Sequence, residues 1–150
     1  MRDKASRRAL AVAATVIAGL TATSVAAQEN VTFHGQTEED VKVKLTVASF
    51  GNATAFRVGA YEVKCNNKGT LSNEAFTYKD LDTSDPGSFS DKRRSSSKAG
   101  KFKFKSKTKI AGTATADDSS WSGTYKVTTR VLKRGSRIDT CKLETTWDAA

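Results

Sequence analysis

The segment KFKFKSKTKI at residues 101–110 constrains the fold most, because a lysine stands at every odd position. Successive side chains of a β-strand point to opposite faces, so a polar–apolar period of two predicts an extended chain. We expect this strand to direct its lysines to solvent and to bury Phe102, Phe104 and Ile110.

The rest of the chain repeats this period of two. Apolar and polar residues alternate at 41–47, 121–131 and 141–147, and turn clusters rich in Gly, Asn and Asp separate such stretches. Short strands with regular turns predict an all-β fold, either an antiparallel β-sandwich or, alternatively, a small β-barrel. An immunoglobulin domain fits badly, because Trp121 follows Cys65 by 56 residues instead of closely.

A hairpin is predicted for residues 110–127, with its turn at 117–120. The expected register places Ile110 opposite Val127. It brings further bases opposite the lysine strand, and like charges in directly opposed positions are unfavourable.

Residues 1–27 have the features of a signal peptide. Bases precede a short apolar run, and Val25–Ala27 supplies the small residues that a signal peptidase requires. Arg7-Arg8 also resembles the twin-arginine pattern, so both export routes stay open. We expect one secreted or envelope-associated domain at 28–150, without a membrane span after processing, carrying 21 bases against 15 acids.

Cys65 and Cys141 are the only cysteines of the chain. In an exported protein the default expectation for such a pair is a disulfide. Both cysteines have inward parity on their strands, where a bridge would link two sheets. With His34 they would make a poor metal-ligand set, and CxxC spacing is lacking, so we expect neither a metal nor a cofactor.

Positive charge is concentrated in one part of the sequence. Nine of the 21 bases fall between Lys92 and Lys109. Within this stretch, residues 91–100 (DKRRSSSKAG) have no apolar side chain larger than alanine, which predicts a flexible, solvated loop. The candidate anion-binding residues are Arg93, Arg94, Lys101, Lys103, Lys105, Lys107, Lys109, Lys126 and Arg130.

Two interpretations of the lysine strand stay open. In the first, the lysines face water and prevent edge-to-edge aggregation. In the second, they form a platform for an anionic envelope polymer such as a teichoic acid or an acidic polysaccharide. Nucleic-acid binding is disfavoured, because the period of two separates the aromatic residues from the bases, whereas single-strand binders present both together.

Catalytic motifs such as GxSxG, HExxH, a Walker loop and CxxC are missing from the sequence. The acids of DLDTSD at 80–85 lack the loop length and glycine of a calcium-binding EF-hand. We therefore expect a non-catalytic domain. The alternatives are a carboxylate-based hydrolase of a wall polysaccharide, or a secreted protein inhibitor that presents residues 84–100.

Four short motifs together resemble a group of small exported actinobacterial proteins of unknown function. They are FHGQT at 33–37, Val63-Lys64-Cys65, the hairpin glycines Gly112 and Gly123, and CKLETTW at 141–147. Members of that group begin with a G-x-T strand and end with a cysteine and a tryptophan near the C-terminus. The resemblance covers most of residues 31–149, and it implies an exported β-sandwich with a disulfide but no site residue.

Overall fold

The computed structural model describes residues 29–83 and 85–150, and most of these residues are in antiparallel strands. In this part, one 3-10 turn, η1 (Ser49–Gly51), is the sole helical element. The strands are β1 (Val31–Thr37), β2 (Lys42–Ala48), β3 (Asn52–Val58), β4 (Tyr61–Cys65), β5 (Thr70–Asn73), β6 (Phe76–Lys79), β7 (Ser88–Ala99), β8 (Phe102–Ala114), β9 (Trp121–Lys133) and β10 (Ser136–Ala149).

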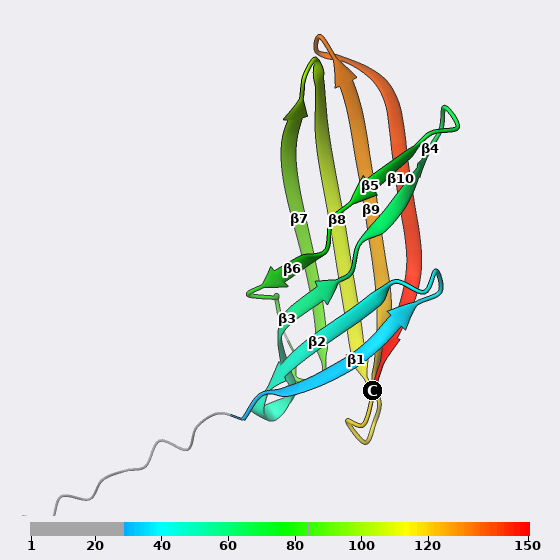
Figure 1. Cartoon of the computed structure of the whole chain (residues 1–150). Coiled ribbons are helices and arrows are strands. Elements are labelled where there is room, and N and C mark those ends of the chain that lie inside the picture. Colours follow the sequence, from blue (N-terminus) through cyan, green and yellow to red (C-terminus); the bar gives the residue numbers. More distant parts are fainter. Residues whose placement is uncertain (1–28, 84) are drawn as a thin grey trace, which may run out of the picture.

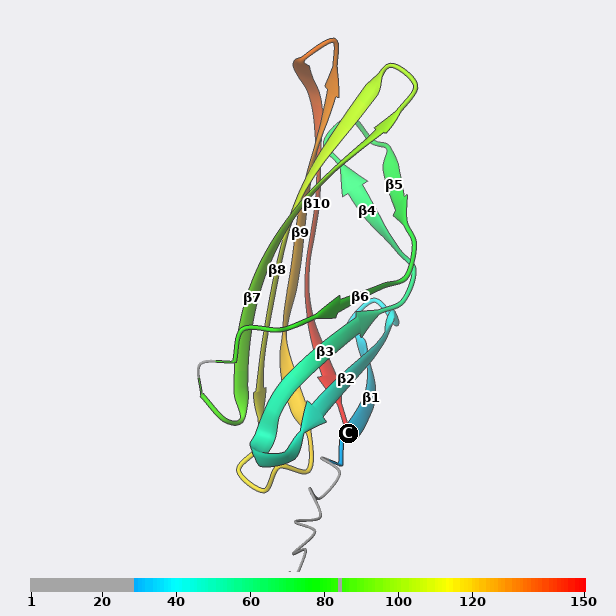
Figure 2. The same cartoon turned by 90° about the vertical axis from the view of Figure 1, so that its left-hand side faces the viewer.

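Eight of the strands form one path in the order β6-β3-β2-β1-β10-β9-β8-β7. The path curls, so that β1–β3 and β6 lie across one half of the long strands β7–β10 (Figure 1, Figure 2). Strands β4 and β5 leave this path, with β4 pairing to β10. The predicted all-β antiparallel fold is confirmed. Its two facing layers belong to a single curled sheet that is continuous through β1 and β10.

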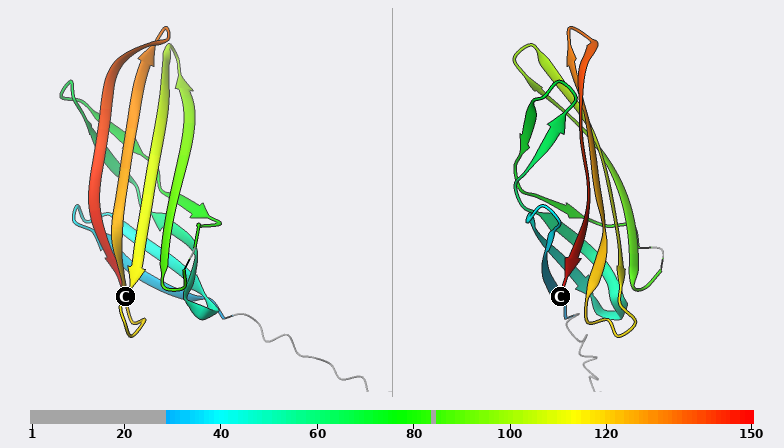
Figure 3. Two further views of the ribbon diagram at one scale, coloured as in Figure 1. Left: turned by 180° about the vertical axis from the view of Figure 1, so that it is seen from behind. Right: turned by 90° about the vertical axis from the view of Figure 1, so that its right-hand side faces the viewer.

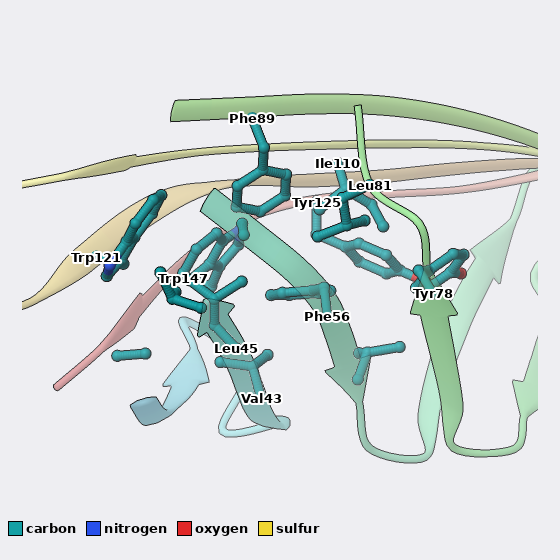
Figure 4. Packing of buried hydrophobic residues seen from close by; sticks show 14 of the residues in the cluster. Val43, Leu45, Phe56, Tyr78, Leu81, Phe89, Ile110, Trp121, Tyr125 and Trp147 are labelled. Carbon is teal, nitrogen blue, oxygen red and sulfur yellow. The ribbon is translucent and has the colours of Figure 1, made fainter. Parts of the chain in front are cut away.

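The core lies between the two layers and is dominated by aromatic side chains (Figure 4). Phe56 of β3 packs against Trp147 of β10, with ring centroids 5.0 Å apart. Phe89 of β7 lies 6.1 Å from both Trp121 and Trp147. Burial of such large rings supplies most of the apolar stabilisation of a small domain.

The register of the β8–β9 hairpin differs from the predicted one by two residues. Ile110 lies opposite Tyr125, so the expected pairing with Val127 is wrong. The new register places Gly112 directly opposite Gly123. Side-chain parity alone permits either register, because a shift of two residues keeps every side chain on its face.

The opposed glycines explain the observed register. A Cβ atom on Gly112 would lie only 2.6 Å from ring atoms of both Phe89 and Trp147. One on Gly123 would overlap the backbone carbonyl oxygen of Ala111 and would lie 2.7 Å from Trp147. The two glycines thus leave a hollow on the inner face of the sheet, and the Trp147 indole fills it.

The flexible loop predicted at 91–100 is wrong, because Ser88–Ala99 form β7 and pair with β8 along their whole length. Phe89 and Asp91 are the buried residues of this strand, and the other side chains are largely exposed. Backbone hydrogen bonds to β8 therefore hold β7 with little help from side-chain burial, which is why its composition resembles that of a loop. Gly100, with a φ of 56°, makes the turn into β8.

The extended conformation expected at 101–110 is confirmed from Phe102 onward, whereas Lys101 lies in the preceding turn. More exposed and more buried positions alternate from Phe104 to Ile110. Phe102 and Phe104 lie on the inner side, but they are only half-buried and fall outside the core cluster. The prediction that they are core residues is therefore wrong. The layer formed by β1–β3 and β6 does not extend to this end of β8 (Figure 1).

The predicted disulfide between Cys65 and Cys141 is present. The two cysteines lie directly opposite each other on the paired strands β4 and β10. The bridge therefore joins neighbouring strands, and not two facing sheets as predicted. After β3 the chain crosses from the β2 side to β10, and the disulfide fixes this crossing with only two paired positions of β4 and β10 beside it.

Candidate functional site

The outer face of β7–β10, opposite the core, carries basic side chains in register across neighbouring strands. Lys92, Lys109 and Lys126 occupy directly opposed positions on β7, β8 and β9. Seen from behind, none of the other described elements lies over these four strands (Figure 3). This face therefore leaves its side chains open to large molecules.

Three further rows follow along the strands, about 6.8 Å apart on each strand. We call the four rows together the basic rows. The second row contains Arg94, Lys107, Thr128 and Lys142, the third contains Ser96, Lys105, Arg130 and Thr140, and the fourth contains Lys98 opposite Lys103.

Carboxylates hardly compensate this charge. Glu144 of β10 lies opposite Lys126 and extends the first row. It is the one acid among the described residues of the basic rows, and it forms an ion pair with Lys126. Lys109 lies opposite lysines on both neighbouring strands. Such like-charge cross-strand pairs are unfavourable for folding.

The surface above the rows contains a depression of about 720 Å³. Its lining includes Arg94, Lys103, Lys105, Lys107 and Arg130, from β7, β8 and β9. Basic side chains of three strands thus converge on one open site.

The structure brings together most of the candidate residues predicted from the sequence. Lys103, Lys105, Lys107, Lys109, Lys126, Arg130 and Arg94 all lie in the basic rows. Lys101 is in the turn before β8, with its Nζ atom 5.8 Å from the centroid of the Phe102 ring.

Arg93 is the candidate that faces the other way. Its Nε atom donates to the Asp91 carboxylate at 2.7 Å, and its guanidinium also donates to the backbone carbonyls of Lys79 and Asp80. These contacts tie β7 to the end of β6 on the inner side of the sheet. Of the two adjacent candidates, only Arg94 therefore lies in the basic rows, since adjacent strand residues point to opposite faces.

Lys142 and Lys64 were missed as members of the same face. They lie directly opposite each other beside the disulfide, on β10 and β4. The available signal was their position next to Cys141 and Cys65 in strands with a period of two. The strand order, which places β10 beside β9 and so Lys142 beside the lysine strand, could not be read from the sequence.

Other candidates for chemistry do not gather into a site. His34 is exposed on β1. In the described part of the chain, no group of three or more potential metal ligands comes together.

No protein-family model, curated protein or solved structure matches this chain. The resemblance to small exported actinobacterial proteins thus stays a prediction.

The signal peptide predicted at 1–27 lies outside the described residues. Within 29–83 and 85–150 no helix has the length and apolarity to span a membrane. A disulfide is typical of an oxidising, extracytoplasmic environment.

Proposed function

We propose that the protein is a non-catalytic, exported domain that binds an anionic polymer of the cell envelope through the basic rows. The observation that carries this proposal is the alignment of lysines and arginines in opposed positions on three adjacent strands. Such an array attracts a chain of phosphates or carboxylates, which can contact several rows at once.

Protection of a sheet edge does not account for the array. Lysines on an edge strand prevent aggregation, and this explanation suits β7. Strand β8, however, is paired with β7 on one side and with β9 on the other, so it has no free edge. Its lysines, and Lys126 and Arg130 on β9, require a different explanation.

The arrangement is also unfavourable for stability. Each like-charge pair costs the folded state several tenths of a kcal/mol relative to an opposite-charge pair. A requirement for positive charge on this face explains why lysines stand opposite lysines.

The inhibitor alternative depends on a loop presented at residues 84–100. Residues 88–99 form a paired strand and not such a loop.

The test is retention of the purified protein on cell wall, with and without its teichoic acid, over a series of salt concentrations. The variant carries serine at Lys105, Lys107 and Lys109, and the matched control carries serine at Lys42, Lys44 and Lys68, which are exposed elsewhere. Both triple variants lose the same formal charge. Any difference between them therefore reports the position of the charge and not its amount.

We expect the outer-face variant to bind at least about 10-fold more weakly at physiological salt, with a shallower dependence on salt, because three ionic contacts are lost. The control should bind like the unmodified protein. Retention that ignores salt, or equal weakening of both variants, would contradict the proposal.

A further inference from the structure

The inner face of strands β7–β10 changes from apolar to polar along the strands. Near the core it is apolar, with Phe89 and Ile110 buried. Further along, Ser95 and Ser97 of β7 and Ser106 of β8 occupy the inward positions. A sandwich core requires apolar residues at such positions, so this part of the inner face is not built as core.

A cavity of about 770 Å³ lies over these hydroxyl groups. Its other wall is formed by Tyr61 of β4 and by residues 73–80, which include β6. Figure 2 shows these elements on one side and the far halves of β7 and β8 on the other. The volume falls within the range of about 300–1,000 Å³ that is usual for ligand sites.

Fixed contacts connect the two walls. The Tyr125 hydroxyl lies 3.0 Å from that of Tyr61 and 2.9 Å from that of Tyr78, so three strands meet in one hydrogen-bonded cluster. Arg93 donates from β7 to the carbonyls of Lys79 and Asp80 at the end of β6. The cavity is therefore preorganised and needs no closure to form.

Most of the cavity lining differs in chemistry from the lining of the depression over the basic rows. Charged side chains of both signs are present, with Glu74 and Asp80 beside Lys79 and Arg93. Arg94, Ser95 and Ser106 line both this cavity and the depression over the basic rows. Ser97 and Thr108 offer hydroxyls that both donate and accept hydrogen bonds. A mixed lining of this kind does not select a strongly anionic ligand as the basic rows do.

An aromatic side chain stands exposed in the same wall. Phe76 is 57% exposed and packs edge-on against Tyr78, with ring centroids 4.9 Å apart. An exposed phenyl ring in a cavity lined with hydroxyls provides an apolar surface beside hydrogen-bonding groups. Sugar rings have the complementary combination of apolar C–H faces and hydroxyl edges.

The geometry points to a second binding site in this cavity, for a short neutral oligosaccharide. One ring stacks on Phe76, and its hydroxyls bond to Ser95, Ser97 and Ser106. This site lies over the inner side of the sheet, and it shares only Arg94, Ser95 and Ser106 with the depression over the basic rows. It selects by stacking and hydrogen bonding, whereas the basic rows select by charge.

The probes are four neutral tetrasaccharides, built from N-acetylglucosamine, cellobiose, maltose and xylose units. Each is titrated into the purified protein up to about 10 mM by calorimetry, at physiological salt and at about 1 M NaCl. We expect at least one to bind with a Kd in the millimolar range or tighter, with little change between the two salt concentrations. The lysine-to-serine variant of Lys105, Lys107 and Lys109 should bind it unchanged.

Two variants locate the site. Phe76→Ala removes the stacking surface and Ser97→Leu fills the cavity, and each should weaken binding at least about 10-fold. Val31→Ala is the control, because Val31 is 54% exposed but does not line the cavity. Thermal unfolding confirms that all three variants are folded.

The inference is overturned if none of the four sugars binds, or if binding survives both Phe76→Ala and Ser97→Leu. It is also overturned if high salt or the outer-face lysine variant abolishes binding, because the sugar would then occupy the basic rows. Release of new reducing ends would assign the cavity to a hydrolase and would overturn a role in binding alone. Retention on cell wall through the basic rows is measured separately. Either proposal can therefore be contradicted while the other stands.

Discussion

Gly112 lies directly opposite Gly123, and the indole of Trp147 rests against both. Neither glycine has a side chain on the inner face of the sheet, whereas the neighbouring inward positions do. Trp147 also contacts the rings of Phe56 and Phe89. The two glycines therefore position the tryptophan ring at the centre of the aromatic core.

The first prediction concerns this hollow. Gly112→Ala should destabilise the protein by about 1–3 kcal/mol, because the new methyl group overlaps the rings of Phe89 and Trp147. Gly123→Ala should cost at least as much, because its methyl group also overlaps the backbone carbonyl of Ala111. Gly69→Ala is the control, since a Cβ atom there has no neighbour within 4 Å. It should change the free energy of unfolding by less than about 0.5 kcal/mol in urea titrations. Equal effects at Gly112 and Gly69 would show that Trp147 is not seated as described.

The second prediction separates the two adjacent arginines. Arg93→Ala leaves the Asp91 carboxylate, whose side chain is only 10% exposed, without its ion-pair partner. We expect a cost of about 1–3 kcal/mol in the free energy of unfolding. Arg94→Ala, on the outer face, should leave stability within about 0.5 kcal/mol but weaken retention on cell wall. A reversed pattern would mean that the two faces of β7 have been assigned wrongly.

The third prediction concerns the disulfide. Its closed loop spans 76 residues in sequence, which corresponds to a maximum of about 4.5 kcal/mol in the chain-entropy description. Cys65→Ser with Cys141→Ser should therefore lower the free energy of unfolding by up to this amount. Because β4 has only two paired positions on β10, amide hydrogen exchange should rise most in β4 and β5. If amide exchange rises equally in β8 and β9, the disulfide does not stabilise β4 and β5 locally.

The fourth prediction is a conflict between stability and binding. Lys109→Glu places a carboxylate between Lys92 and Lys126, so it should stabilise the fold by about 0.2–1 kcal/mol, most at low salt. The same change should reduce retention on cell wall. Thermal unfolding and the wall assay measure the two effects on one variant. A variant that is less stable and equally well retained would argue against the basic rows as a binding surface.

The fifth prediction is a dependence on high pH. Burial raises the pKa of the Tyr125 phenol far above its ordinary value near 10, and the nearby Tyr61 and Tyr78 hydroxyls act in the same direction. The folded state therefore keeps a proton that the unfolded chain releases. Stability from this group is complete below about pH 10 and falls above it, by up to about 1.4 kcal/mol per pH unit.

Tyr125→Phe isolates this effect. The variant loses two hydrogen bonds and should be about 1–2 kcal/mol less stable near neutral pH. Its free energy of unfolding should then fall less steeply than that of the unmodified protein between about pH 10 and 11.5. Identical slopes in the two proteins would mean that Tyr125 ionises as readily in the folded state as in the unfolded one.

The sequence was sufficient for those features that depend on side-chain period. The alternation at 101–110 placed the lysines and Phe102 on opposite faces, and two cysteines in a predicted exported chain indicated the disulfide. Features that depend on pairing were missed. A shift of two residues leaves parity unchanged, so the β8–β9 register required knowledge of where Trp147 packs.

Strand β7 was missed for a related reason. Composition predicts burial, and a strand held mainly by backbone bonds to one neighbour has little to bury. The difference between Arg93 and Arg94 followed from that error, because a loop assigns no face to either residue. The hydroxyl-lined cavity was likewise invisible, since its walls come from segments that only the crossing of β4 to β10 brings together.

The lysines of β8 and the layer formed by β1–β3 and β6 lie on opposite sides of the long strands. A molecule adsorbed on a negatively charged envelope by those lysines would have a fixed orientation. It would lie flat, with the N-terminal strands turned outward to the medium, where they would be the first part of the protein that an approaching molecule meets.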